Sequence, residues 1–169
     1  ALVTSYVYDT DGTLLTTIQG SGADDHMGFG SSAAGDVNGD GFYDVCAAAD
    51  EDNVAGVGAN AGSATIVSGF DGSTLFTFNG VAGSDLFGWS TAAVGDVNGD
   101  VRDDVLVGAL NAEDVSSPSN AGSLTVFSGA DGSVLWRVFG DAVGGQLGSN
   151  VGRAGDVNGD GRADFAGVQ

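Results

Sequence analysis

Three sets of oxygen-bearing residues in this chain have the spacing of a loop that binds a hard cation. Side-chain oxygens occur at positions 1, 3, 5 and 9 of each loop, and position 7 offers its backbone carbonyl. The donors are Asp36, Asn38, Asp40, Phe42 and Asp44; Asp96, Asn98, Asp100, Arg102 and Asp104; and Asp156, Asn158, Asp160, Arg162 and Asp164. Mixed carboxylate, amide and carbonyl donors favour Ca²⁺, which predicts about three calcium ions per chain, one in each loop.

Other cations and other loop families fit these residues less well. Mg²⁺ usually keeps several of its waters, and the loops contain none of the Cys or His ligands that Zn²⁺ prefers. A helix–loop–helix calcium site needs an acid at position 12, where this chain has Ala47, Val107 and Gly167. The alternative without metal is a set of Asx-rich turns. Three copies in register, each with an aspartate at position 9, argue against that alternative.

The second loop differs from the others at one position. Val101 stands where Gly41 and Gly161 stand in the other two loops. A β-branched residue resists the positive φ angle that a sharp turn requires. We therefore expect the second loop to bind its ion less tightly.

The loops belong to a longer internal repeat. The string Gly-Asp-Val-Asn-Gly-Asp occurs at 35–40, 95–100 and 155–160, so its copies are evenly spaced along the chain. The flanking sequence repeats in the same register, which gives units 1–60, 61–120 and 121–169. A fixed period of this length is typical of a solenoid, a propeller or another repeat array.

Composition excludes several classes of partner. The chain has 23 acidic and 4 basic residues, and its net charge of −19 excludes nucleic acid and anionic membrane surfaces. Three bound divalent ions would change this charge to −13. No apolar run is long enough to span a membrane, so no membrane insertion is expected. The single cysteine, Cys46, lies in an apolar run and is predicted to be a small core residue.

The pattern of apolar residues predicts strands and no helices. In the second repeat, short β-branched and aromatic runs occur near 88–94, 104–109, 123–128 and 133–139. An Asp-Gly pair at 131–132 between the last two runs is a strong hairpin signal. Four antiparallel strands in each repeat describe a propeller blade. The predicted fold is therefore an all-β propeller of four-stranded antiparallel blades, with three blade equivalents in this chain.

The phase of the repeat sets the predicted blade boundaries. Full blades are expected at about 25–80 and 85–140, with half-blades at 1–20 and 145–169. Propellers typically use four to eight blades, so three cannot close a ring. Unpaired half-blades would also expose strand edges. We therefore expect a homo-oligomer that exchanges half-blades, a longer parent chain, or an open assembly.

The repeats resemble the FG-GAP repeats of integrin α-subunit β-propellers over the whole chain. Phe87-Gly88 corresponds to the "FG" element, and Val107-Gly108-Ala109-Leu110 corresponds to "GAP" without its proline. Each Asp loop matches the calcium loop of that family, except at Val101. The resemblance implies a seven-bladed ring in integrins, with calcium loops on the bottom face and ligand recognition on the top face. It also implies an extracellular location, secreted or at the cell surface.

These observations predict a non-enzymatic module for adhesion or protein assembly, with calcium in a structural role. The only histidine, His26, has no equivalent in the other repeats, and a Ser-His-Asp triad is therefore not expected. A protein or glycan ligand would bind the face opposite the Asp loops, near loops 50–61 and 110–121. One alternative is a glycan-binding propeller that uses Trp89 or Trp136. Another is a filament subunit completed by half-blade exchange.

Overall fold

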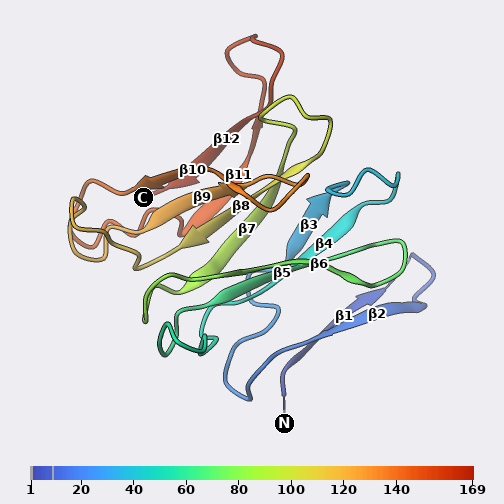
Figure 1. The fold of residues 1–169 in the computed structure, drawn as a ribbon, viewed down its shortest axis with the longest axis horizontal. Helices are drawn as coiled ribbons and strands as arrows, with labels where there is room; N and C mark the ends of the chain where they lie inside the picture. The colour runs from blue at the N-terminus through green and yellow to red at the C-terminus, as the bar shows by residue number, and fades with distance from the viewer. Residues whose placement is uncertain (1, 9) are drawn as a thin grey trace.

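The computed structural model describes residues 2–8 and 10–169 and consists of strands, turns and loops (Figure 1). Ala1 and Asp9, which belong to the predicted half-blade 1–20, lie outside the described residues. The strands in the described part are β1 (Thr4–Tyr8), β2 (Leu14–Gln19), β3 (Ser32–Gly35), β4 (Asp44–Ala49), β5 (Ser63–Val67), β6 (Thr74–Asn79), β7 (Phe87–Gly95), β8 (Asp104–Ala109), β9 (Ser123–Phe127), β10 (Val134–Phe139), β11 (Asn150–Gly155) and β12 (Asp164–Val168). No helix that could cross a membrane is found among these residues.

Two four-stranded sheets form the centre of the molecule. One has the order β3-β4-β5-β6, the other has the order β7-β8-β9-β10, and all neighbouring strands are antiparallel. Strands that follow one another in the sequence are neighbours in the sheet, as in a propeller blade. The all-β fold of four-stranded antiparallel blades is thereby confirmed.

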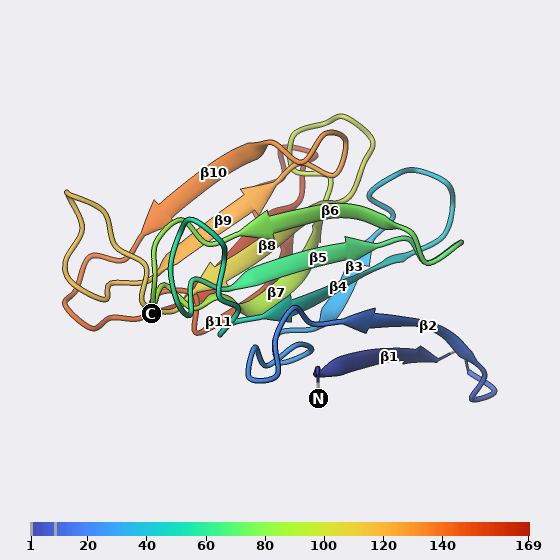
Figure 2. The same cartoon turned by 60° about the horizontal axis from the view of Figure 1, so that its bottom comes forward.

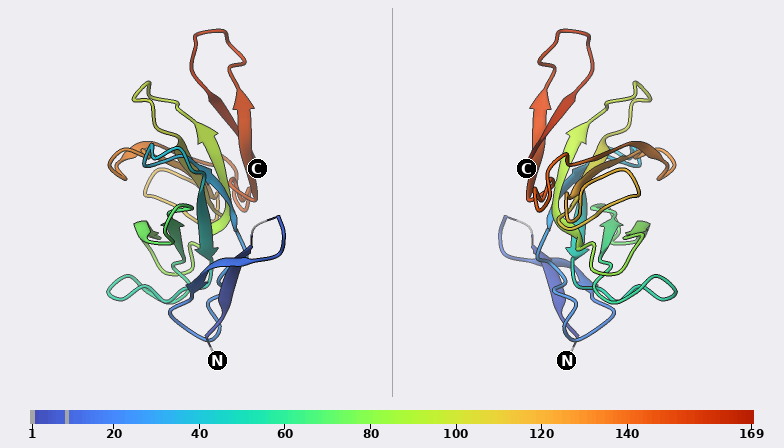
Figure 3. Two further views of the ribbon diagram at one scale, coloured as in Figure 1. Left: turned by 90° about the vertical axis from the view of Figure 1, so that its right-hand side faces the viewer. Right: turned by 90° about the vertical axis from the view of Figure 1, so that its left-hand side faces the viewer.

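Two further hairpins flank the central sheets. The hairpin β1–β2 packs beside the first sheet (Figure 2), and the hairpin β11–β12 packs beside the second (Figure 1). The two hairpins lie at opposite ends of the molecule in both side views (Figure 3). Within the described residues they therefore do not pair with each other, and each keeps unpaired strand edges.

Burial follows the position of a strand within its sheet. The second strand of the second sheet, β8, is buried at all six residues because its two faces contact neighbouring sheets. The outer strand β10 alternates between exposed and half-buried residues, the pattern of a strand with one face in solvent. The apolar run that predicted β8 thus identified a strand covered on both faces.

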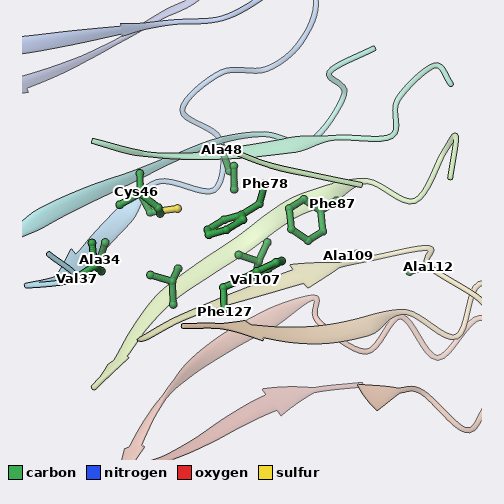
Figure 4. Close-up of a cluster of buried hydrophobic side chains, with 13 residues drawn as sticks. Ala34, Val37, Cys46, Ala48, Phe78, Phe87, Val107, Ala109, Ala112 and Phe127 are labelled. Carbon is green, nitrogen blue, oxygen red and sulfur yellow. The ribbon is translucent and has the colours of Figure 1, made fainter. Parts of the chain in front are cut away.

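A shared core joins the two central sheets (Figure 4). Phe78 of the first sheet stacks on Phe127 of the second, with ring centroids 3.9 Å apart, and Phe87 meets Phe127 edge-on at 5.9 Å. Cys46 is fully buried in this core, as predicted, and burial raises the pKa of its thiol to about 12. The sheets therefore adhere through an aromatic interface that neither sheet would bury alone.

A backbone joint connects each central sheet to the next element in the chain. Gly62 forms a parallel bridge with Phe87, and Gly122 forms the same bridge with Leu147, one repeat further along the chain. At Gly62, φ is 82°, and a Cβ atom would lie 2.0 Å from the Phe87 carbonyl oxygen. Only glycine allows this approach, so the repeated Ala-Gly-Ser sequence fixes how neighbouring blades meet.

Candidate metal centres

The three Asp loops lie at one end of the fold. They connect β3 to β4, β7 to β8 and β11 to β12. Figure 1 shows these loops on the same side as the Asp-Gly turns, while loops 50–61 and 110–121 extend from the opposite side. An antiparallel meander requires this arrangement, because alternate connections fall at alternate ends of the sheet.

Backbone N–H groups organise the first loop around its own side chains. The Asp36 carboxylate accepts hydrogen bonds from the N–H groups of Asp40 and Gly41, both at 3.0 Å. Asn38 Oδ1 accepts from the Asp40 N–H at 2.9 Å, and Asp40 Oδ1 accepts from the Phe42 N–H at 2.8 Å. The predicted donors of this loop are therefore drawn into one tight turn.

The same bonds recur in the other loops, one and two repeats further along the chain. Asp96 accepts from the N–H groups of Asp100 and Val101, at 3.1 and 2.8 Å. Asp156 accepts from Asp160 and Gly161, at 3.1 and 2.9 Å. The sequence repeat is thus also a repeat of local geometry.

The aspartate at position 9 is a buried carboxylate in the first two loops. Asp44 and Asp104 are 1% and 0% exposed. Asp104 accepts hydrogen bonds from the Val97 N–H at 2.9 Å and from the Gly129 N–H at 3.0 Å. Gly129 lies just after β9, so this one carboxylate ties the Asp loop to the β9–β10 turn.

Burial and neighbouring negative charges both disfavour the ionised form of Asp104. Burial raises the pKa of its carboxyl to about 6, and the charges of Asp100 and Asp96 act in the same direction. The N–H groups of Val97 and Gly129 oppose this rise. The pKa of Asp44 is raised for the same first reason, burial. A bound cation would stabilise the ionised form of both groups.

The loop carboxylates do not converge on one point in this structure. Within residues 2–8 and 10–169, no loop brings oxygens of three of its acids within 4.8 Å of one another. Asn38 instead donates its amide N–H to Asp40 Oδ2 at 2.9 Å. Backbone N–H groups and this amide hold the loop carboxylates in their present positions. The donor set fits Ca²⁺ in number and chemistry, and binding requires the side chains to turn inward.

Contacts between neighbouring loops were not predicted from the sequence. The Asp103 carboxylate accepts a hydrogen bond from the Asp36 N–H at 2.9 Å, across the boundary between two repeats. The other two repeats have Tyr43 and Ala163 at the position of Asp103, so the repeat pattern did not mark Asp103 as a contact residue. The first and second Asp loops are therefore linked directly.

Each tryptophan contacts an aromatic ring outside its own sheet. The Trp89 ring centroid is 4.9 Å from that of Phe29, and the Trp136 ring centroid is 6.3 Å from that of Phe165. Trp136 keeps 45% of its surface exposed because it lies on the outer strand β10. Both tryptophan rings therefore take part in packing between neighbouring parts of the fold.

Val101 adopts the conformation that its side chain disfavours. Its φ is 69°, against 90° and 87° at the equivalent Gly41 and Gly161. The second loop thus forms the same turn as the others and stores strain of about 1–2 kcal/mol.

Replacing Val101 with glycine is expected to stabilise the protein by about 1 kcal/mol and to strengthen calcium binding at the second loop. Urea denaturation and calcium titration would measure the two effects. Val115→Gly, at an exposed valine without a positive φ, is the matched control and should not stabilise. Equal effects of the two substitutions would show that strain at Val101 is absent.

Comparison with known proteins identifies relatives of the chain. Integrin alpha-8 from Gallus gallus is 36% identical over 153 residues, and Integrin alpha-8 from Homo sapiens and Mus musculus are 34% and 33% identical over the same length. These matches cover 85% of this chain but only 13–14% of each relative, and no family model matches. With their repeated Asp loops and four-stranded antiparallel sheets, these residues belong to the integrin-α-like FG-GAP β-propeller family.

Proposed function

We propose that the chain is a calcium-binding FG-GAP propeller module that acts in adhesion or protein assembly, at the cell surface or in a secreted protein. Calcium has a structural role in this proposal. The observation that carries it is the buried carboxylate at position 9, which joins the Asp loop to the next turn of the same sheet. An ion held there would stabilise two connections of one blade at once.

The proposed calcium ligands are all oxygen atoms of the chain itself. In each loop the carboxylates at positions 1, 5 and 9, the amide oxygen at position 3 and the carbonyl at position 7 would hold the ion. The ion would supply positive charge that cancels the repulsion among these carboxylates. No step of bond making or breaking is involved, and the proposed module is not an enzyme.

Isothermal titration calorimetry tests this proposal directly. Calcium should bind with a stoichiometry of about three per chain, and Mg²⁺ at the same concentration should bind much more weakly. Asp156→Asn together with Asp160→Asn should remove one of the three sites. A stoichiometry unchanged by this double substitution would contradict the assignment of the third loop.

A glycan-binding role is the second candidate, and one opening favours it. Phe29 and Trp89 line a shallow opening of about 340 Å³ together with Ser31, Ser90 and Asn150. An aromatic ring beside hydroxyl and amide groups can stack on a sugar and bind its hydroxyls. Glycan-array binding that Trp89→Ala abolishes and Trp136→Ala preserves would support this role over protein adhesion.

Partners are proposed from the open strand edges. The hairpins β1–β2 and β11–β12 each present an edge that pairs with no other strand of the described residues. We propose that these edges complete one blade with a second copy of the chain or with a further segment of the same protein. Size-exclusion chromatography with light scattering distinguishes the two, because only exchange between copies gives a mass that rises with concentration.

A further inference from the structure

A cluster of one histidine and two acidic residues lies at the end of the first sheet that is opposite its Asp loop. Asp50 and Glu51 directly follow β4, and His26 lies on the segment that leads into β3. His26 Nδ1 is 3.5 Å from Asp50 Oδ1 and 3.7 Å from Glu51 Oε1. In the described part of the chain, this is the one group of three such side chains whose ligand atoms all lie within 4.8 Å.

Asp50 is buried without the hydrogen bonds that a buried carboxylate requires. Its side chain is 1% exposed, and neither Oδ1 nor Oδ2 has a hydrogen-bond partner. The equally buried Asp104, by contrast, accepts two backbone N–H groups. An unpartnered buried charge is costly, so a positive group at His26 or beside it would stabilise the ionised form of Asp50.

The distances in the cluster fit metal ligands better than hydrogen-bond partners. A separation of 3.5 or 3.7 Å is too long for an N–H···O hydrogen bond. Ligands bound to tetrahedral Zn²⁺ at about 2.0–2.2 Å lie about 3.3–3.5 Å from one another. One imidazole and two carboxylates also suit Zn²⁺, whereas Ca²⁺ prefers oxygen ligands alone.

We propose that His26, Asp50 and Glu51 bind a divalent transition-metal ion, best matched by Zn²⁺, with one coordination position open to solvent. His26 and Glu51 are 49% and 36% exposed, so the ion would reach the cluster from water and keep a water ligand. The site would be independent of the Asp loops, which lie at the other end of the sheet.

The repeat provides an internal comparison for this proposal. The residues equivalent to His26 are Leu86 and Gln146, and φ is between 54° and 57° at all three. The residue equivalent to Asp50 is Leu110. The blade therefore fixes the backbone, and only the first repeat places ligands on it.

Zinc titration of the calcium-saturated protein tests the proposal. His26 is the only histidine, so the imidazole NMR signals of the chain report this site alone. These signals should shift and saturate at one equivalent of Zn²⁺. His26→Gln, which copies the residue of the third repeat, should weaken zinc binding by about 100-fold or more in calorimetry. Asp50→Asn should do the same.

Two controls make the result decisive. Asp24→Asn removes a nearby exposed charge and should leave zinc binding unchanged. His26→Gln should keep the shift in melting temperature that calcium causes in the parent, because His26 is exposed and far from the Asp loops. The cluster would be only an ion pair if the imidazole signals do not shift on addition of Zn²⁺. Equal zinc affinity in His26→Gln and the parent would show the same.

Discussion

Removing calcium is expected to lower the melting temperature of this protein by roughly 20 °C. A ligand present at about 100 times its dissociation constant stabilises the folded state by about 2.7 kcal/mol. Three such loops would contribute about 8 kcal/mol. In a chain of this size, each change of about 1 kcal/mol moves the melting temperature by about 2–4 °C. Thermal denaturation followed by circular dichroism, with excess Ca²⁺ and then with EDTA, measures the difference.

General screening must be separated from specific binding in that experiment. With a net charge of −19, any salt reduces self-repulsion and stabilises the folded state to some extent. Sodium chloride at matched ionic strength and Mg²⁺ at the same concentration are therefore the controls. If either salt restores the melting temperature as fully as Ca²⁺ does, the loops do not bind calcium specifically.

Asp104→Asn is expected to destabilise the protein much more with calcium than without it. With calcium, the variant should lose about 3 kcal/mol of stability because the second loop loses a ligand and a hydrogen-bond acceptor. With EDTA at neutral pH, the substitution removes a buried charge that its neighbours repel, which offsets much of that loss. Urea denaturation of both proteins under both conditions measures the difference between the two effects.

The pH dependence of the calcium-free protein provides a second measurement. The folded pKa of Asp104, about 6, exceeds the ordinary value of 3.8. This carboxyl therefore destabilises the folded state above about pH 6, and the penalty declines as the pH falls from about 6 towards about 4. The parent in EDTA should gain stability over this window relative to Asp104→Asn. Asp24→Asn, at an exposed aspartate, should follow the parent, and parallel curves for parent and Asp104→Asn would contradict the prediction.

The strands and the loops were predictable because their signals are local and repeated. Strands expected at 88–94, 104–109 and 123–128 occur at Phe87–Gly95, Asp104–Ala109 and Ser123–Phe127. Short apolar runs between Gly, Asp and Ser leave little choice of strand boundary. Three nearly identical loops likewise fixed the candidate calcium donors, whose occupancy remains a prediction.

Contacts that break the repeat were not predictable from the sequence. Asp50, which follows β4, contacts His26, which precedes β3. Neither residue is repeated in the other units. The stacking of Phe78 on Phe127 depends on how two sheets face each other, which no local pattern encodes. The loop carboxylates bond to backbone N–H groups such as those of Gly41 and Val97, and a comparison of donor types does not reveal these bonds.

The paired bridges Gly62–Phe87 and Gly122–Leu147 have a geometric consequence. A joint that recurs with the same hydrogen bonds applies the same rotation and translation at every step. Such a head-to-tail operation generates a closed ring when its rotation divides a full circle and its translation vanishes, and otherwise a helix. The curvature of a larger assembly built from these blades therefore depends in part on Gly62 and Gly122, and a side chain at either glycine would change the rotation between blades. The first repeat has Leu2 at the equivalent position.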